Sequence, residues 1–180
     1  AVLIGSSLAI SGAAFQAMFV NPLVSPGILG VLSGASFGAA LGMVMGWSWF
    51  FINLSTFIFG LIAVLFALLI SFIYSSAKNM IILVLGGIIS SSLFSALLSI
   101  VKYAADPYDA VPAITYWLMG SLSFSTSSIV WNLTIPMLGG ILILIFFSKY
   151  LNALSLGDEE AKALGINTKL IKLIIIIVAT

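Results

Sequence analysis

Long apolar runs separated by short polar breaks extend through the whole sequence. Five of these runs are long enough to cross a bilayer as a helix, because about 20 apolar residues span the hydrocarbon core. They cover residues 1–20, 27–46, 49–73, 80–101 and 128–147, and a sixth run begins near residue 170. Both ends of the sequence fall within apolar runs, so we expect a fragment of a longer protein. The pattern predicts an all-α fold, a polytopic membrane helix bundle.

The first break lies between residues 20 and 27 and contains Asn21, Pro22 and Pro26. Proline lacks a backbone N–H and disfavours a helical conformation for the residue before it, so we expect Asn21 to leave the helix. A proline is tolerated in the first turn of a helix, and Pro26 is therefore expected to begin the next span. Gln16, an amide among apolar neighbours, is expected to bond to another helix.

Small residues recur in two of the predicted spans. In the second, a glycine appears at every fourth position: Gly30, Gly34, Gly38, Gly42 and Gly46. Helices in lipid associate through close backbone approach over small side chains, so this strip predicts a packing face, with a substrate-lining role as the alternative. The fourth span carries Ser90, Ser91, Ser92 and Ser95. Their hydroxyls either bond between helices or line a wetted pathway.

Two proline-containing stretches indicate irregular helices. Pro136 and the Gly139–Gly140 pair lie inside the fifth span and favour a kink there. Pro112 and residues 117–128 indicate a short interfacial helix or a re-entrant piece between the fourth and fifth spans.

Composition and charge narrow the function. Of 180 residues, 62% are hydrophobic and 6% are charged, and the net charge is +1. No basic face for nucleic acid is available, and the chain has neither cysteine nor histidine. The middle of each span lacks acidic and basic side chains, which proton-coupled transporters use as relays. We therefore expect no catalytic, cofactor-binding or metal-ligating residue, and an energy source on another subunit.

The lysines predict the orientation in the membrane. Alternating spans place five of the six lysines on the side of the breaks that follow the first, third and fifth spans. They are Lys78, Lys149, Lys162, Lys169 and Lys172, whereas Lys102 lies on the opposite side near Asp106 and Asp109. Basic residues near span ends stay in the cytoplasm. The segment after the fifth span is therefore expected to be cytoplasmic.

This cytoplasmic segment predicts a short helix. Asp158 is expected to cap it, with Glu159 and Glu160 in the first turn, where the helix dipole favours negative charge. Gly165 suits the left-handed position that ends a helix, and Asn167 with Thr168 can cap the next. Several apolar residues exceed what a free loop needs, which indicates a docking surface rather than a solvated connector. These residues are Leu151, Leu154, Leu156, Leu164 and Ile166.

Three separated groups of residues carry a resemblance to a known family. The first comprises Ser11-Gly12-Ala13, Gln16, Asn21-Pro22-Leu23, Pro26, Leu29-Gly30 and Ser33-Gly34-Ala35. The second is Trp117-Leu118-Met119-Gly120-Ser121-Leu122. The third comprises Leu151-Asn152-Ala153-Leu154, Leu156-Gly157, Glu160-Ala161 and Leu164-Gly165. In this order, over nearly the whole chain, they resemble the signature of FecCD-type permeases.

The resemblance implies a membrane subunit of an ABC importer for iron–siderophore complexes, haem or cobalamin, in the cell inner membrane. Such permeases have about ten spans, and this chain would cover the second to the start of the seventh. The resemblance also implies a second permease subunit, two cytoplasmic ATP-binding subunits and an extracytoplasmic substrate-binding protein as partners. All of 1–180 would then form one permease domain.

The resemblance further assigns roles to residues. Within residues 151–168 the ATPase-coupling loop would comprise Leu156, Gly157, Asp158, Glu159, Glu160, Ala161, Leu164 and Gly165, and we expect Ala161 to face solvent on its surface. The span with Ser90, Ser91, Ser92 and Ser95 would line the pathway. A gate turn would fall, by position alone, at Ser75, Ser76, Lys78 and Asn79.

Two other functions fit the residues and stay open at this point. A secondary transporter would need broken helices and an ion site. A non-transporting membrane scaffold fits the glycine strip but leaves the short cytoplasmic helix unexplained.

Overall fold

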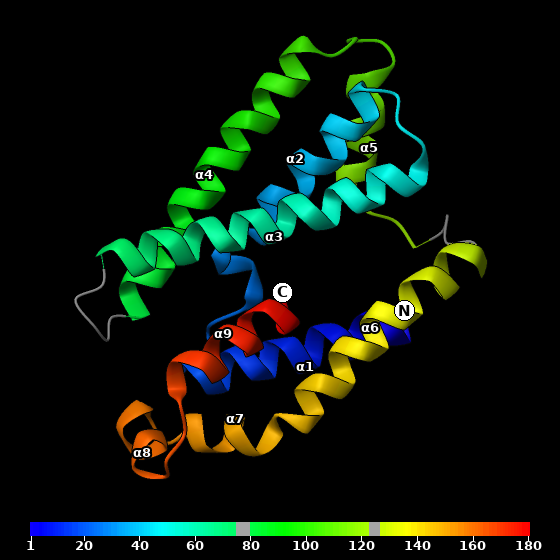
Figure 1. The fold of residues 1–180 in the computed structure, drawn as a ribbon. Helices are drawn as coiled ribbons and strands as arrows, with labels where there is room; N and C mark the ends of the chain where they lie inside the picture. The colour runs from blue at the N-terminus through cyan, green and yellow to red at the C-terminus, as the bar shows by residue number, and fades with distance from the viewer. Residues whose placement is uncertain (75–79, 123–126) are drawn as a thin grey trace. The chain divides into compact units, whose positions relative to one another are not determined.

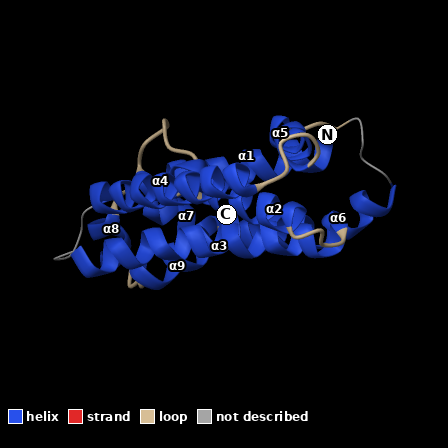
Figure 2. Ribbon diagram, turned by 90° about the horizontal axis from the view of Figure 1, so that it is seen from above, coloured by secondary structure: helices blue, strands red, loops and turns tan. Residues whose placement is uncertain are grey.

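The computed structural model describes residues 1–74, 80–122 and 127–180, and every regular element in these ranges is helical (Figure 2). The helices are α1 (Val2–Phe19), the 3₁₀ helix η1 (Pro26–Leu29), α2 (Val31–Val44), α3 (Trp49–Tyr74), α4 (Met80–Ala104), α5 (Ala110–Met119), α6 (Ser127–Phe146), α7 (Ser148–Leu154), α8 (Asp158–Ala163) and α9 (Thr168–Ala179). The predicted all-α fold is confirmed.

The chain divides into two compact units, each described by itself. Unit 1 comprises residues 1–26 and 122–180 and contains α1 and α6 to α9 (Figure 1). Unit 2 comprises residues 27–121 and contains most of η1 together with α2 to α5. The prediction that residues 1–180 form one permease domain stays a prediction.

In unit 2, α2 packs against α3 through glycines. A Cβ atom added to Gly34 would overlap the Phe59 carbonyl oxygen, and one added to Gly38 would lie 2.5 Å from the Ser55 carbonyl oxygen. Because real Cβ atoms do not approach backbone so closely, these positions admit only glycine at the present helix separation. The four-residue spacing thus brings two backbones together, as small residues do in membrane helix pairs.

Two buried serines join α3 to its neighbours in unit 2. The Ser55 hydroxyl donates to the Gly38 carbonyl oxygen at 2.9 Å, and the Ser90 hydroxyl donates to the Ala63 carbonyl oxygen at 2.7 Å. Ser90 is fully buried. Each bond satisfies a hydroxyl that would otherwise be costly to bury, and each fixes one helix against another.

The second predicted span, residues 27–46, is not one helix. It consists of η1, then Gly30 in a left-handed conformation (φ 85°), then the 14-residue α2, which is about 21 Å long at 1.5 Å per residue. Gly87 of α4 lets the backbone at Ile28 and Leu29 approach so closely that no side chain fits between them. This contact holds η1 against α4 and explains the break. Gly46 lies beyond α2 at φ 66° with open space around it, so it does not belong to the packing face.

The turn after α1 is fixed by its own polar groups. The helix ends at Val20, which is left-handed at φ 49°, one residue before the predicted exit at Asn21. The Gln16 side-chain amide donates to the Pro22 carbonyl oxygen at 2.9 Å, and the Asn21 side-chain oxygen accepts from the Leu23 backbone N–H at 2.9 Å. The expectation that Gln16 bonds to another helix was wrong, because the turn brings a free carbonyl within its reach.

Unit 1 has its core where α1 packs with α6 and α9. Phe15 and Met18 of α1 and Ile175 of α9 are almost completely buried. The helix α6 continues through Pro136, and a bend of 56° lies between Phe146 and Ser148. The kink expected at Pro136 and Gly139–Gly140 stays a prediction, and the bend at Phe147, where α6 gives way to α7, was not predicted.

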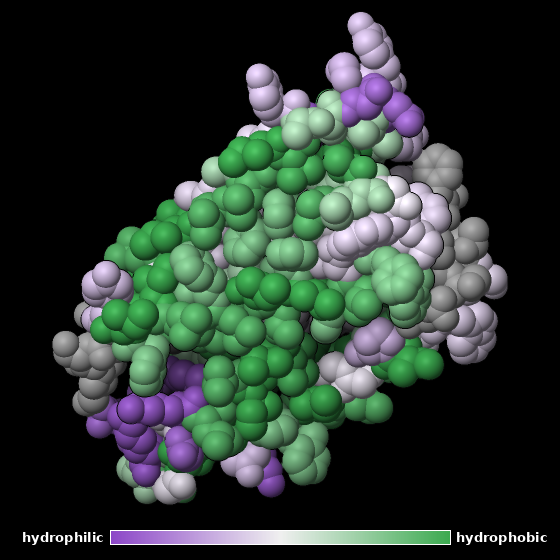
Figure 3. All heavy atoms as spheres, turned by 45° about the horizontal axis from the view of Figure 1, so that its top comes forward, coloured by the Kyte–Doolittle hydropathy of each residue, from purple (hydrophilic) through white to green (hydrophobic). Residues whose placement is uncertain are grey.

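Three described helices are long and apolar enough to cross a membrane: Val2–Phe19, Trp49–Tyr74 and Ile81–Ala104. The bent pair Leu133–Phe146 and Ser148–Leu154 would add a fourth. The second of the five expected spans is not a complete one, because α2 has 14 residues, and the other four match α1, α3, α4 and the α6–α7 pair. Figure 3 shows hydrophobic side chains covering most of the visible face, as lipid-facing helices require.

The α2–α3 contact generates a prediction about stability. We expect Gly38→Leu in the full-length protein to lower the free energy of unfolding by about 1–3 kcal/mol, because the new side chain meets backbone that cannot move aside. The thermal midpoint of the purified protein in detergent measures the change. Gly139→Leu is the control, since a Cβ there meets nothing within 4 Å. Equal midpoints for the two variants would contradict close packing at Gly38.

Candidate functional site

The segment from Leu151 to Gly165 contains two short helices joined by a tight turn. Between α7 and α8, Gly157 adopts φ 120° and ψ 160°, and a Cβ there would lie 2.5 Å from the Glu160 Oε2 atom. A glycine is favoured here, since residues with a side chain rarely adopt this positive φ and a Cβ would displace the Glu160 carboxylate. The turn therefore directs α8 away from the line of α7 (Figure 1).

The helix α8 begins one residue earlier than predicted. Gly157 is the N-cap, and Asp158 is the first helical residue with no capping hydrogen bond from its side chain. The expected capping role of Asp158 was wrong because its carboxylate binds a lysine instead. Asp158, Glu159 and Glu160 do lie in the first turn, where the helix dipole favours negative charge.

The end of α8 is a left-handed glycine stop, as predicted. Gly165 has φ 78°, its N–H donates to the Lys162 carbonyl oxygen at 2.8 Å, and the Ile166 N–H donates to the Ala161 carbonyl oxygen at 3.1 Å. This pair of bonds is the Schellman arrangement. The next helix is also capped as predicted, because the Asn167 side chain accepts from the Leu170 N–H at 3.2 Å. These bonds give the loop a defined shape.

The faces of α8 differ from the prediction at one position. Ala161 is 0% exposed, so it faces the interior of unit 1 and not solvent. Leu154 at the end of α7 is also fully buried. Two large apolar residues are exposed, Leu156 and Leu164, at 66% each. We call these two leucines the apolar surface of the loop; they flank α8 at its two ends.

An ion pair ties α8 to α9. The Lys172 Nζ atom lies 2.6 Å from Oδ1 and 2.8 Å from Oδ2 of Asp158. The exposed fraction is 21% for the Lys172 side chain and 40% for the Asp158 side chain. A second pair, Lys162 with Glu159, is longer at 3.5 Å, more exposed, and confined to α8. Of these two pairs, the first joins two elements.

The four serines predicted to line a pathway have different environments. Ser90 is buried in the α3–α4 contact, which fits a packing role rather than a lining role. The Ser92 hydroxyl donates to the Ile88 carbonyl oxygen in its own helix. The Ser95 hydroxyl donates to the Ser33 hydroxyl of α2 at 3.3 Å. Ser91 is partly exposed, and Ser92 and Ser95 are exposed. A lining role for these three stays a prediction. The proposed gate turn of Ser75, Ser76, Lys78 and Asn79 lies outside the described residues.

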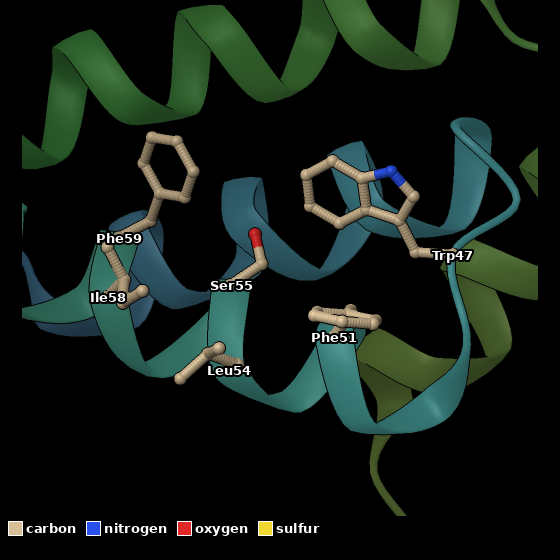
Figure 4. A pocket seen from close by; sticks show the side chains of 6 residues that line it. All are labelled: Trp47, Phe51, Leu54, Ser55, Ile58 and Phe59. Atoms are coloured by element: carbon tan, nitrogen blue, oxygen red, sulfur yellow. The ribbon is translucent and has the colours of Figure 1, made fainter.

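A shallow groove of about 160 Å³ lies beside the N-terminal half of α3 in unit 2. It is lined by Trp47, Phe51, Leu54, Ser55, Ile58 and Phe59 (Figure 4). Its one hydroxyl, on Ser55, is already bonded to Gly38. The indole nitrogen of Trp47 is the other polar side-chain atom among these six residues, so the groove is largely apolar. The described residues also contain no cluster of three or more His, Cys, Asp or Glu side chains suited to a metal ion.

Comparison with known proteins decides the family. The sequence model of the FecCD transport family matches residues 1–180. The chain belongs to the FecCD transport family. As a FecCD chain with several apolar helices, it is part of a multi-pass membrane protein.

Similar proteins carry related names. The chain is 40% identical over 166 residues to the molybdate import system permease protein MolB of Haemophilus influenzae, covering 92% of this chain and 49% of MolB. It is 35% identical over 172 residues to a probable iron chelatin transport system permease of Helicobacter pylori, covering 96% and 51%. It is 33% identical over 172 residues to the vitamin B12 import system permease BtuC of Klebsiella pneumoniae, covering 92% and 49%.

A solved structure agrees with this assignment. An inward-facing structure described as that of a metal-chelate type ABC transporter matches with a TM-score of 0.90 at 38% identity, covering 98% of this chain and 56% of that one. The chain thus spans about half the length of the FecCD relatives it matches.

Sequence reasoning missed the partner of Asp158 and the inward direction of Ala161. A signal for the ion pair was present in the sequence. Asp158 and Lys172 carry opposite charges 14 positions apart, and Gly157 and Gly165 allow the chain to turn at both ends of α8. Such a signal does not name the partner, because Lys162 and Lys169 lie closer to Asp158 in the sequence. For Ala161, a six-residue helix is too short to show a clear apolar period.

The burial of Ala161 generates a prediction about local order. We expect Ala161→Arg to displace α8, because a long charged side chain cannot occupy a fully buried alanine site. Protease cleavage between residues 157 and 166 of the full-length protein should then accelerate. Ala163→Arg, at an exposed position of the same helix, is the matched control and should leave the cleavage rate unchanged. Slow cleavage of both variants would show that Ala161 tolerates bulk.

Proposed function

We propose that the full-length protein is the permease subunit of an ATP-driven importer in the cytoplasmic membrane. The match of the FecCD family to residues 1–180 carries this proposal, and the similarity to an ABC transporter structure supports it. In this role the protein performs no hydrolysis itself; ATP is hydrolysed on separate subunits. Ion-coupled transport and a non-transporting scaffold are not favoured, because the relatives carry the names of ABC-transporter permeases.

The partners follow from the same role. They are a second permease subunit, identical or closely related, two cytoplasmic ATP-binding subunits and an extracytoplasmic substrate-binding protein. The substrate class we favour is a metal chelate such as an iron–siderophore complex, haem or cobalamin, consistent with the names of the iron chelatin and B12 relatives. Molybdate is the second candidate, favoured by the 40% identity to MolB.

Energy enters through the loop from Leu156 to Gly165. The glycine turn at Gly157 and the stop at Gly165 give α8 a defined orientation, and Leu156 with Leu164 present exposed apolar side chains at its ends. Apolar residues exposed beside charged ones are typical of interaction surfaces. We assign this apolar surface to contact with the ATP-binding subunit.

A substitution at Leu164 tests the assignment. We expect Leu164→Arg to weaken association with the ATP-binding subunit by about 1–3 kcal/mol, the scale for one important interface residue, because charge replaces apolar contact. Co-purification of the full-length permease with its ATP-binding subunit, together with substrate uptake, measures the effect. Tyr108→Arg is the control: Tyr108 is 93% exposed in the segment between α4 and α5, which we place outside the cell. Wild-type association and uptake for Leu164→Arg would remove the loop from the coupling interface.

The orientation has its own test. In a full-length protein otherwise without cysteine, Asp109→Cys should react with a membrane-impermeant thiol reagent in intact cells. Lys169→Cys, on the lysine-rich side, should react only after the cells are permeabilised, because basic residues near span ends stay in the cytoplasm. The reverse labelling pattern would invert the orientation and place α8 out of reach of any ATP-binding subunit.

A further inference from the structure

The helix α8 depends on its attachments for its position. It has six residues, and an isolated helix of that length is not stable in water because nucleation is costly. Its attachments to the rest of unit 1 include the buried Ala161 and the ion pair of Asp158 with Lys172. Ala161 offers a single methyl group. The ion pair adds a directional attachment.

The geometry of the ion pair suits a mechanical link between α8 and α9. Both carboxylate oxygens of Asp158 lie within 2.8 Å of the Lys172 Nζ atom, so the lysine is held between them. Both side chains are partly buried, and partly buried pairs are screened less by salt than exposed ones. The two residues are 14 positions apart, and the pair closes a loop that contains all of α8 and its glycine stop. The N-terminal end of α8 is thereby fixed to the second turn of α9.

Lys172 connects this loop to the core of unit 1. Its neighbour Ile171 and the next-turn residues Ile175 and Ile176 are buried, where α9 packs with α1 and α6. Figure 1 shows α8 beyond the end of α7 and beside the start of α9. Since close-packed helices move as rigid bodies, a displacement of α8 that pulls on Lys172 is passed to α9 as a whole.

We propose that Asp158 and Lys172 are positioning residues that transmit movement of α8 to α9. This inference rests on the proposed function, in which an ATP-binding subunit moves α8. The apolar surface of Leu156 and Leu164 makes the contact with that subunit, and the ion pair carries the movement into the membrane helices. Leu156 and Leu164 thus contact the partner, whereas Asp158 and Lys172 transmit the movement.

The test uses the full-length permease with its ATP-binding subunits and substrate-binding protein. Asp158→Asn and Lys172→Gln each remove one charge and keep the side-chain size. We expect both variants to retain association with the ATP-binding subunit, because Leu156 and Leu164 are unchanged. Uptake should fall at least tenfold, and ATP hydrolysis should respond less to the substrate-loaded binding protein. The double variant Asp158→Lys with Lys172→Asp restores the pair in reverse and should recover most of the uptake.

Lys162→Gln is the matched control, since it removes a lysine from α8 whose bond to Glu159 stays within the helix. It should keep wild-type uptake. A purely structural role would lower expression or association in the single variants, whereas a transmitting role leaves both unchanged and lowers only uptake and the response of ATP hydrolysis. Wild-type uptake in either single variant, or loss of uptake that the reversed pair does not restore, would overturn the proposal.

Hydrogen exchange separates failure of this inference from failure of the proposed function. Amides of residues 158–166 should exchange at least tenfold faster in Asp158→Asn than in the wild type, and the reversed pair should slow them again. This readout needs no transport. If the wild type shows no ATP-dependent uptake, the proposed function fails, and the exchange rates alone decide whether the pair fixes α8. Unchanged exchange in Asp158→Asn would show that it does not.

Discussion

The direct approach of helix backbones over glycine is the constraint on which unit 2 depends. At Gly34 and Gly38 the backbone of α3 occupies the space of a missing side chain, and at Gly87 the backbone of η1 does the same on α4. Lipid provides little hydrophobic drive for helix association, so stability has to come from such close contacts and from interhelical hydrogen bonds. The bonds of Ser55 and Ser90 supply the second contribution at the same interfaces.

Glycines also shape the loop around α8, but there they permit tight turns rather than close helix packing. Gly157 and Gly165 allow left-handed or extended backbone that other residues disfavour, and the chain can therefore enter and leave α8 within one residue at each end. A helix this short has no independent stability, which makes its anchoring points decisive. Ala161 anchors it through burial and Asp158 through charge.

Some residues of this loop are exposed for contact and others hold α8 in place, which is consistent with membership of the FecCD family. The exposed leucines lie where another protein could reach them, whereas the groups that hold α8 are turned towards unit 1. A surface that docks must stay accessible, and a link that transmits movement must be attached to packed structure. Under the proposed function one short segment has to meet both requirements, so changes at neighbouring positions such as Asp158 and Leu156 are expected to affect different steps.

Much of the architecture follows from the sequence because its causes are local. The long apolar runs predicted the helices, the Asn21–Pro22 break predicted the end of the first, and Gly165 and Asn167 predicted a helix stop and a cap. The three motif groups also indicated the family that the comparisons show. Hydrophobic runs, glycine stops and caps act over a few residues, and each can be recognised without knowing its surroundings.

Tertiary structure alone decided which polar groups meet and which faces are covered. Ser90 finds the carbonyl of a residue 27 positions earlier, and Asp158 finds a lysine 14 positions later. The break at Gly30 depends on how closely η1 approaches α4, and the burial of Ala161 depends on the helices beside α8. Contacts between residues distant in the sequence decide these outcomes, and a one-dimensional pattern of apolar and polar positions contains no information on their separation in space.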